Sequence, residues 1–413
     1  MNQSIVFENA RILDGSSPEG EHDRHVRVAS GLIVEVSDKP IKDGSARRID
    51  LKGKTLMPGL IDCHVHVTAV VIDPGQNAKL PDVTVAYRTA RVMKDMLLRG
   101  FTTVRDVGGA TFALQEAVEQ KLIEAPRLVI CGKALSQTGG HTDFRGRYDN
   151  RPADSQTYRL GSMGRICDGV DECRRAARDE IRQGAQFIKV MANGGVASPT
   201  DPIAFLGFSV DELTAIVEEA SNAQTYVSAH LYTDEAIARA LNCGIRSIEH
   251  ANLIEPATAR LLREKGAIAC PTLVAYEALK SDGEALGMPS VSVQKIDDVR
   301  LSSPRSLEIM HEAGVSMAYG SDLLGGLHKY QSDEFLYRGR VLPAIDVIRS
   351  ATCIAAELIG MPGKIGVLKP GAYADLIVVD GDPLANLALL TEQGRYMPAI
   401  IKDGEFVKDN LSE

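Results

Sequence analysis

The chain has 413 residues, with 46 basic and 55 acidic side chains and a formal net charge of −9. Its 44% hydrophobic and 24% charged residues are typical of a globular protein and exclude a disordered or collagen-like chain. The acidic excess argues against a nucleic-acid partner, because phosphate backbones are bound through clustered Lys and Arg. One α/β barrel takes about 250 residues, so the length predicts a barrel and a further structural unit.

The cysteines and the apolar runs bear on location. The seven cysteines include no C-x-x-C pair, which favours free thiols in a reducing cytoplasm over disulfides or cysteine zinc sites. Residues 1–5 lack the basic flank and apolar run of a signal peptide, and there is no uncharged apolar stretch of about 18 residues. We therefore expect a cytoplasmic protein with no membrane partner.

The two ends of the chain predict a small antiparallel sheet. Short apolar runs at 5–7, 10–13, 26–28 and 32–36 are separated by Asp14-Gly15 and Ser30-Gly31, which are typical of hairpin turns. Similar runs return at 376–380, 399–402 and 405–407. Chain ends often lie close together, so we predict a β-sandwich satellite domain built from residues 1–56 and 366–413.

Between the ends, short apolar strands alternate with helical stretches. Strand candidates end near residues 62, 106, 131, 190, 230, 249, 271 and 319. Helix candidates include residues 83–99, 170–183, 210–223 and 234–243. Eight such alternations predict an α/β fold with a parallel (β/α)8 TIM barrel, whose domain we place at residues 57–365. A doubly wound open sheet is the alternative, because periodicity cannot show closure.

The clearest chemical signal is His64-Val65-His66 at the end of the first barrel strand. Side chains on a strand alternate with a period of two, so both imidazoles point to the same side and can reach one metal ion. Catalytic groups of these barrels sit at the C-terminal ends of the strands. The position therefore turns a common pattern into a candidate metal site.

Further ionisable residues lie at the C-terminal ends of other predicted strands, at the same level in the barrel as His64 and His66. Lys189 ends the fourth strand, His230 the fifth, His250 the sixth and Asp322 the eighth. Burying so many polar groups at one barrel mouth is costly, so we interpret them as one site. Because an ammonium repels cations, Lys189 can serve there only as a neutral amine or as a carbamate formed with carbon dioxide.

The motifs around these residues resemble the amidohydrolase superfamily, in its binuclear branch with a carboxylated lysine. The resemblance spans essentially the whole chain and includes MPGLIDCHVH at 57–66 and KPGAYADL at 369–376. More narrowly, SQTGGH at 136–141 and MANGGVASPTD at 191–201 resemble bacterial prolidase-like dipeptidases. Relatives in that group hydrolyse Xaa-Pro dipeptides or other N-acylated amino acids, and some cleave ochratoxin-type amides.

The resemblance implies two divalent metal ions per chain, for which Zn²⁺ suits the ligand types best. It assigns His64 and His66 to the first ion, His230 and His250 to the second, N6-carboxylated Lys189 to both, and Asp322 to the first. Two ions about 3.5–4 Å apart acidify a shared water and polarise the scissile carbonyl, so attack by a bridging hydroxide is expected. Asp322 would act as base and then as acid toward the leaving amine.

Other residues are candidates for catalysis and substrate binding. His141 ends the third strand and Tyr232 lies two residues after His230, so either could hydrogen-bond the developing oxyanion or hold a substrate carboxylate. Gly194 would let the backbone approach a ligand. His328, in the loop after the eighth strand, is a further candidate substrate contact. We interpret Arg105-Asp106 as structural.

The main hypothesis is a binuclear zinc-dependent amidohydrolase that cleaves dipeptides or N-acyl amino acids with a free C-terminal carboxylate, prolidase-like toward Xaa-Pro. One alternative keeps the site but takes a xenobiotic or mycotoxin amide, a carbamate or a lactone. Another is a mononuclear deaminase with Glu249 as its catalytic carboxylate. A non-catalytic scaffold is disfavoured, because every expected ligand is present. By the resemblance, we expect a homo-oligomer that acts on small-molecule substrates.

Overall fold

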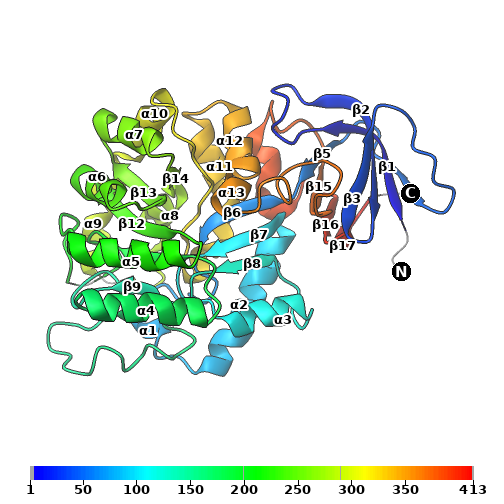
Figure 1. Cartoon of the computed structure of the whole chain (residues 1–413). Helices are drawn as coiled ribbons and strands as arrows, with labels where there is room; N and C mark the ends of the chain where they lie inside the picture. The colour runs from blue at the N-terminus through cyan, green and yellow to red at the C-terminus, as the bar shows by residue number, and fades with distance from the viewer. Residues whose placement is uncertain (1–3, 199, 289, 412–413) are drawn as a thin grey trace.

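The computed structural model describes residues 4–198, 200–288 and 290–411. A barrel surrounded by helices forms the larger part, and a β-rich satellite holds both ends of the chain (Figure 1). The predicted fold class, a TIM barrel with an extra β-domain from both chain ends, is confirmed.

The satellite is one eight-stranded sheet with the order β17-β16-β15-β5-β1-β2-β3, in which β4 pairs with β1. Its strands are β1 Ile5–Ile12, β2 Glu21–Ala29, β3 Leu32–Ser37, β4 Arg47–Asp50, β5 Thr55–Pro58, β15 Leu376–Val379, β16 Ala399–Lys402 and β17 Glu405–Asp409. The two chain ends are joined where β5 pairs antiparallel with β15. The sheet has its own apolar core, with Phe7, Leu56 and Ile401 fully buried.

The two predicted turns differ. Ser30 and Gly31 both have positive φ, 53° and 79°, and form the tight β2–β3 connection that the sequence predicts. Asp14-Gly15 is not a tight hairpin, since β1 ends at Ile12 and β2 begins at Glu21. Asp14 instead accepts hydrogen bonds within its loop and from the backbone N–H of Leu368, so it ties the loop to the C-terminal segment.

The barrel strands are parallel and meet in a closed ring. They are β6 Leu60–Val65, β7 Phe101–Asp106, β8 Arg127–Ile130, β9 Ala134–Ser136, β11 Ile188–Met191, β12 Val227–Thr233, β13 Ser247–Leu253 and β14 Ile268–Cys270. The third strand is interrupted, so that β8 pairs with β7 and β9 pairs with β11. A short strand β10, Gly164–Ile166, adds to β9.

The eighth strand is reduced to a few residues. Met317 bridges Ala269 of β14, and the backbone N–H of Cys63 in β6 donates to the carbonyl of Tyr319 at 2.8 Å. These bonds close the ring between β14 and β6, which excludes the open-sheet alternative.

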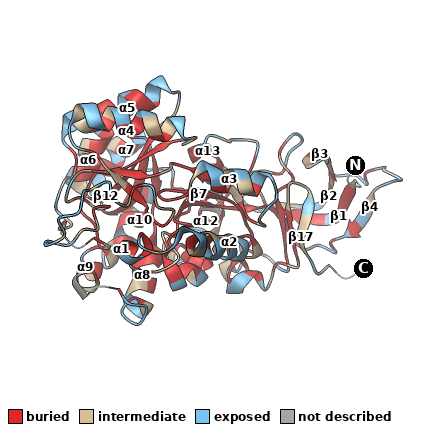
Figure 2. Ribbon diagram, turned by 90° about the horizontal axis from the view of Figure 1, so that it is seen from below, coloured by how far each residue is buried: buried red, intermediate tan, exposed pale blue. Residues whose placement is uncertain are grey.

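The helices lie around the barrel with their buried faces inward (Figure 2). They are α1 Pro74–Asn77, α2 Asp82–Leu98, α3 Phe112–Glu119, α4 Val170–Arg182, α5 Val210–Asn222, α6 Asp234–Asn242, α7 Pro256–Glu264, α8 Leu273–Asp282, α9 Ser290–Arg300, α10 Ser303–Glu312, α11 Glu334–Gly339, α12 Ala344–Ser350 and α13 Cys353–Leu358. The 3₁₀ helices are η1 Gly325–Asp333, η2 Leu387–Leu390 and η3 Glu392–Gly394. The four helices predicted from sequence agree with α2, α4, α5 and α6 to within one residue at each end. In the described part of the chain, no helix is both long and apolar enough to span a membrane.

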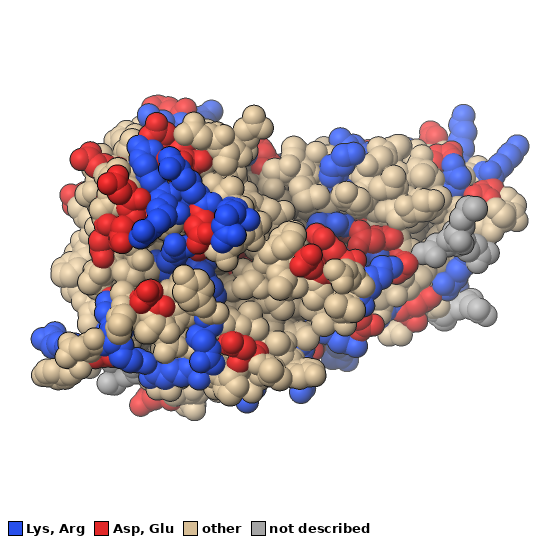
Figure 3. Space-filling model, turned by 60° about the horizontal axis from the view of Figure 1, so that its bottom comes forward, with Lys and Arg blue, Asp and Glu red and all other residues tan. Residues whose placement is uncertain are grey.

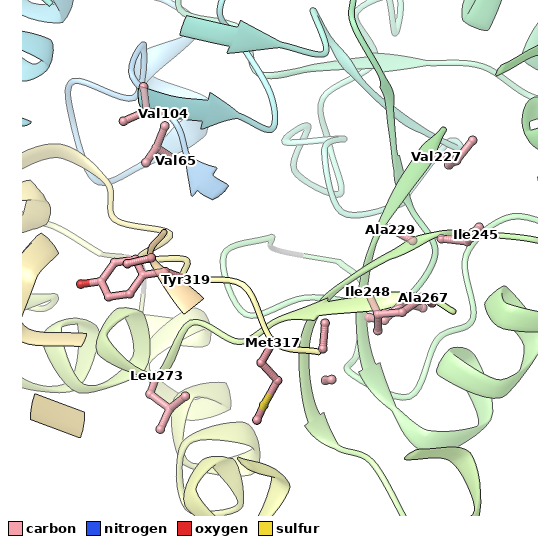
Figure 4. Close-up of a cluster of buried hydrophobic side chains, with 14 of the residues drawn as sticks. Val65, Val104, Val227, Ala229, Ile245, Ile248, Ala267, Leu273, Met317 and Tyr319 are labelled. Atoms are coloured by element: carbon pink, nitrogen blue, oxygen red, sulfur yellow. The ribbon is translucent and has the colours of Figure 1, made fainter. Parts of the chain in front are cut away.

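Apolar side chains from several strands pack against the helices that surround the barrel. Val65, Val104, Ala229 and Ile248 come from β6, β7, β12 and β13 and belong to one buried cluster, which Figure 4 shows with Met317 of the reduced eighth strand. Close-packed interiors deform little. The ends of the strands are therefore held at fixed positions, where the site described next is built.

Candidate active site

His64 and Asp322 are brought together by the closure of the barrel. His64 lies in β6, His66 follows that strand, and both are buried. The backbone N–H of Asp322 donates to the carbonyl of His64 at 2.8 Å. The Asp322 side chain thereby reaches both imidazoles, with Oδ1 3.4 Å from His64 Nε2 and 3.3 Å from His66 Nε2.

These spacings fit a metal ion. Ligand atoms at about 2.0–2.1 Å from a tetrahedral zinc ion lie about 3.3 Å from one another. Asp322 Oδ1 stands at nearly that separation from both histidine nitrogens. His64, His250 and Asp322 also present ligand atoms that all lie within 4.8 Å of one another.

A second pair of histidines adjoins this group. His230 of β12 and His250 of β13 are on neighbouring parallel strands, and His230 Nδ1 lies 2.9 Å from His250 Nε2. The ring of His250 also lies 4.8 Å from that of His64, centroid to centroid. The structure thus brings all four predicted histidine ligands and Asp322 to one place.

Lys189 lies in β11, beside β12, and is 1% exposed. Burial lowers the pKa of its ammonium, more than the charges of Glu249 and Asp322 raise it. The predicted bridging residue is therefore inside the barrel and under the influence of the candidate ligand Asp322.

Each ring has an acceptor or a hydroxyl at its outer nitrogen. The Nδ1 atoms of His64 and His66 contact Glu249 Oε2 at 2.7 Å and the carbonyl of Gly108 at 3.0 Å. His230 Nε2 contacts the carbonyl of Gly194 at 3.2 Å, and His250 Nδ1 contacts Thr272 Oγ1 at 2.8 Å. We assign the proton of each ring to this outer nitrogen. The inner nitrogens then carry the lone pairs that metal coordination requires.

Charge at the site also suits a cation. Burial, followed by the positive charge of neighbouring side chains, holds the pKa of His230 and of His250 well below the ordinary value. Burial alone would raise the pKa of Asp322, but His64 and His66 overcome it and hold that pKa well below its usual range. At His66 burial would lower the pKa, but the hydrogen bond and the charge of Asp322 outweigh it and raise the pKa.

Glu249 is a residue whose role the sequence did not reveal. It is fully buried, and it accepts from Arg105 Nη2 at 2.7 Å, from Ser228 Oγ at 2.6 Å and from His64. Both of its carboxylate oxygens are therefore engaged in holding β6, β7 and β12 around His64. This placement argues against the deaminase hypothesis, in which Glu249 would face the substrate.

The backbone is strained where the ligands stand. His250, Ala251 and Asp322 have φ of 68°, 56° and 50°, in the left-handed region that non-glycine residues seldom adopt. Such conformations persist where the surrounding structure imposes them, and they cluster at functional sites. The strain turns the ends of β13 and of the eighth strand so that their side chains meet.

A cavity opens beside the histidines, with about 560 Å³ of empty space including its mouth. Its polar lining includes His66, His141, Thr142, Tyr232 and Asp322. The remaining lining is mainly apolar and includes Phe144, Met163, Met191, Val196, Tyr276, Leu279 and Leu324. A compact ligand with a polar centre and an apolar body fits this surface.

His141 and Tyr232 both lie at the histidine cluster. The His141 ring stacks on that of His230 at 4.2 Å between centroids, and its Nδ1 lies 2.7 Å from Ser198 Oγ. The Tyr232 ring lies 4.6 Å from that of His230, and its hydroxyl accepts a hydrogen bond from Tyr276 at 3.2 Å. Both predicted substrate-binding side chains therefore line the cavity beside the candidate ligands.

The Amidohydrolase family model matches residues 55–407, which is most of the chain. The chain belongs to the amidohydrolase family. Amidohydrolases are generally metal-dependent, in agreement with the ligand groups described above.

Solved structures of relatives cover nearly the whole of this amidohydrolase. The crystal structure of an amidohydrolase is similar with a TM-score of 0.98 and 51% identity, covering 99% of this chain and 100% of that one. A prolidase crystallised with N-methylphosphonate-L-proline gives a TM-score of 0.96 and 47% identity, covering 98% and 100%. The ochratoxinase of Aspergillus niger is 33% identical over 370 residues, 86% of this chain and 75% of the relative. The chain is therefore a hydrolase that acts on amide C–N bonds.

Two glycines of this amidohydrolase let other parts of the protein, and not a ligand, approach the backbone closely. A Cβ on Gly194 would lie 1.9 Å from the carbonyl oxygen of Pro202, and one on Gly195 would lie 1.8 Å from the His141 ring. Gly194 also supplies the carbonyl that His230 contacts. Neither glycine lines the cavity in this structure, so Gly194 acts on the site through His230.

Helix α9, outside the barrel, holds the loop that contacts His141, and no sequence pattern predicts this contact. Lys295 Nζ of α9 donates to the carbonyls of Gly195, Ser198 and Asp201, each at 2.9 Å. Ser198 Oγ and Asp201 Oδ2 in turn lie 2.7 and 3.5 Å from His141 Nδ1. The orientation of His141 therefore depends on α9.

His328 lies apart from the cavity. It belongs to η1, is buried, and its Nε2 contacts the carbonyl of Ala69 at 3.1 Å. It is absent from the residues that line the cavity beside the histidines. The structure therefore gives it a packing position, where the sequence suggested a substrate contact.

We expect His328 to make stability pH-dependent. Burial lowers its pKa from 6.5 to about 4 in the folded state. Between these values the unfolded chain binds more protons, so the free energy of unfolding falls as the pH drops, by about 1 kcal/mol from pH 7.5 to 5.5. Urea unfolding of the wild type and of His328→Gln at both pH values measures the difference. Equal losses in both proteins would contradict the prediction.

Proposed function

We propose that this amidohydrolase cleaves the amide bond of dipeptides or N-acyl amino acids with a free C-terminal carboxylate, with Xaa-Pro dipeptides as the favoured class. The observation that carries the proposal is the cluster of four histidines, Lys189 and Asp322 beside a small cavity. The 47% identity over 98% of the chain to a prolidase crystallised with a phosphonate analogue of an acyl-proline supports the substrate class.

The donor set suits two divalent ions, with Zn²⁺ favoured by the imidazole ligands. His64, His66 and Asp322 would hold the first ion and His230 and His250 the second, with Lys189 bridging both after N6-carboxylation. The buried position of Lys189 supports this, because burial lowers its pKa and so favours the neutral amine, the form that reacts with carbon dioxide to give a carbamate and a proton. When bound, such ions acidify water and polarise an amide carbonyl.

Asp322 is the group that would move the proton. Its carboxylate is 21% exposed, lines the cavity and is held ionised by the histidines around it. It can therefore accept a proton from the attacking water and deliver it to the leaving nitrogen. In an Xaa-Pro substrate that nitrogen becomes a secondary amine, which is a poor leaving group until it is protonated.

His141 and Tyr232 would bind the substrate. Both can donate hydrogen bonds into the cavity, to the oxygen that becomes negative or to the terminal carboxylate. The apolar lining around Phe144 and Leu324 would exclude water from the acyl side chain or the proline ring. The described residues that line the cavity include no Arg or Lys, so the substrate carboxylate depends on His141, Tyr232 and the bound ions.

A substrate panel with metal analysis tests the proposal. We expect turnover of Xaa-Pro dipeptides with apolar Xaa, and at least tenfold lower kcat/KM, about 1.4 kcal/mol, for the corresponding Xaa-Pro amides, which lack the carboxylate. Metal analysis should give two ions per chain, and mass spectrometry of gently handled protein should detect the carbamate on Lys189. Equal kcat/KM values for the Xaa-Pro dipeptides and their amides would show that the substrate carboxylate is not required.

An ochratoxin-type amide is the second candidate substrate. The observation that favours it is the 33% identity to an ochratoxinase over 86% of this chain. Such a substrate is also an N-acyl amino acid, so the same residues would serve. A higher kcat/KM for N-aroyl-phenylalanine than for any Xaa-Pro dipeptide would favour this reading.

A further inference from the structure

A hollow beside α2, separate from the metal cavity, is lined by basic side chains. It has about 760 Å³ of empty space including its mouth, and shares no lining residue with the cavity at the histidines. Arg88 and Arg91 of α2, Arg99 just after that helix and Lys329 of η1 supply the positive charge. Asp95 is the one carboxylate among its lining residues.

The spacing on α2 explains why these side chains meet. Arg88, Arg91, Asp95 and Arg99 follow one another at intervals of three or four residues, which places them on one helical face. α2 lies at the surface in the view of Figure 2, and Arg88 and Arg91 are exposed. The positive charge of arginines spaced in this way is usually neutralised by acidic residues on a neighbouring element.

The arginines of α4 are neutralised by acidic residues. Basic and acidic side chains adjoin over much of the barrel surface (Figure 3). Arg174 and Arg178 of α4 pair with Glu219 of α5 at 2.7 Å, and Arg175 pairs with Glu172 at 3.1 Å. Among the described residues, neither Arg88 nor Arg91 forms an ion pair.

Arg99 is the buried member of the group. It is 2% exposed, and its Nε and Nη1 donate to the amide oxygens of Gln331 and Gln393, each at 3.0 Å. Its Nη2 has no hydrogen-bond partner in the described part of the chain, where the guanidinium also forms no ion pair. A buried cation with only neutral partners is costly, and burial lowers the pKa of Arg99 to about 10.

We propose that this hollow binds a small oxyanion of the phosphate class between Arg88, Arg91 and Arg99. A guanidinium fork matches the oxygens of a phosphate group, and such charge-assisted hydrogen bonds are the strong ones. Gln393, whose side chain is exposed, accepts from Arg99 Nη1 and donates to the carbonyl of Lys329 at 2.7 Å, so among the described residues Nη2 is the nitrogen of Arg99 left without a partner for an anion to take up. Lys329 forms an ion pair with Asp282 at 3.0 Å, so it adds only to the positive electrostatic potential at the rim of the hollow.

The hollow is joined to the metal centre by one chain of hydrogen bonds. Gln331, which accepts from Arg99, donates to Asp62 Oδ2 at 2.9 Å, and Asp62 Oδ1 accepts from the backbone N–H of His64 at 3.1 Å. The hollow is therefore linked to β6 through Gln331 and Asp62, and its described lining shares no residue with that of the substrate cavity. Substrate turnover without phosphate does not require it.

Calorimetric titration of the metal-loaded protein with inorganic phosphate, at constant ionic strength in chloride, tests the proposal. The double variant Arg88→Gln/Arg91→Gln should bind phosphate at least about tenfold more weakly than the wild type. Phosphate that binds at the metal centre will bind both proteins equally, so the difference reports the hollow alone. Both arginines are exposed, and unchanged melting temperature and turnover will show that the variant is folded.

The matched control is Arg175→Gln/Arg182→Gln on α4, where both arginines are exposed but already paired. It should bind phosphate as the wild type does. Equal isotherms for the wild type and the α2 variant, or an equal loss in the α4 variant, would overturn the site. Malonate bound as tightly as phosphate would overturn the phosphate class.

Discussion

Replacement of Asp322 by Asn is expected to lower kcat by about 10²–10⁴-fold, the usual contribution of a positioned general acid–base. The amide has nearly the shape of the carboxylate and can still face His64 Nε2 and His66 Nε2, which lie 3.4 and 3.3 Å from Oδ1. It cannot take up a proton. Steady-state kinetics on an Xaa-Pro dipeptide measure the loss, and metal analysis of the same sample shows whether the ions are retained.

The control for Asp322→Asn is Asp333→Asn, which changes a carboxylate at the end of η1. That residue is absent from the cavity lining, so its kcat should stay within about twofold of the wild type. If Asp322→Asn with its full metal content turned over within tenfold of the wild type, another group would have to carry the proton. A loss of turnover that merely followed metal loss would assign Asp322 to coordination alone.

Replacement of Arg105 by Met is expected to lower the free energy of unfolding by about 3–5 kcal/mol, because it leaves Glu249 charged and buried. Arg105 is fully buried and donates to Glu249, to Ser247 and Tyr226, and to the carbonyl of Cys63. Its guanidinium also lies 5.0 Å from the centre of the Phe187 ring. Urea unfolding of metal-depleted protein at one pH measures the loss without a contribution from metal binding.

Two further variants separate charge from packing. Arg105→Met/Glu249→Gln should recover at least about 1 kcal/mol, because the amide removes the uncompensated charge. Arg175→Gln, which breaks an exposed pair, should cost less than about 1 kcal/mol. A double variant no more stable than Arg105→Met would show that the cost is packing, and the account of Glu249 given above would fail.

The candidate ligands could be predicted from sequence because their signal is local. His64 and His66 sit two residues apart at the end of one strand, and Lys189, His230 and His250 each lie within a short strand of the same barrel. The barrel then supplies the geometry, since parallel strands of a closed sheet bring their C-terminal ends together. Periodicity and spacing are enough to predict such a site.

The partners of these ligands could not be found in that way. Glu249 stands next to His250 in sequence, yet its carboxylate bonds to His64 and to Arg105, which come from two other strands, and no local pattern indicates these partners. Lys295 acts on a loop almost a hundred residues earlier in the chain, through backbone carbonyls that any sequence offers. Contacts of this kind depend on the path of the chain in three dimensions.

The shortest elements were also beyond sequence reasoning. The eighth strand is only a bridge at Met317, and its pairing with β14 and β6 is set by barrel closure. Asp14-Gly15 looks like a hairpin but lies in a longer loop, because Asp14 bonds to Leu368 near the other end of the chain. Local turn chemistry was overridden there by a tertiary contact.

The pairing of β5 with β15 has a consequence for synthesis. β5 ends at Pro58, directly before β6 and its ligand His64, while its antiparallel partner begins at Leu376. The ribosome makes β5 long before its partner strand, so β5 lacks one neighbour until residues 376–379 have been translated. We expect the base of β6 to become anchored only once β15 has paired with β5. Uptake of divalent ions should then follow the synthesis of β15, and a nascent chain stalled before residue 376 should bind them poorly.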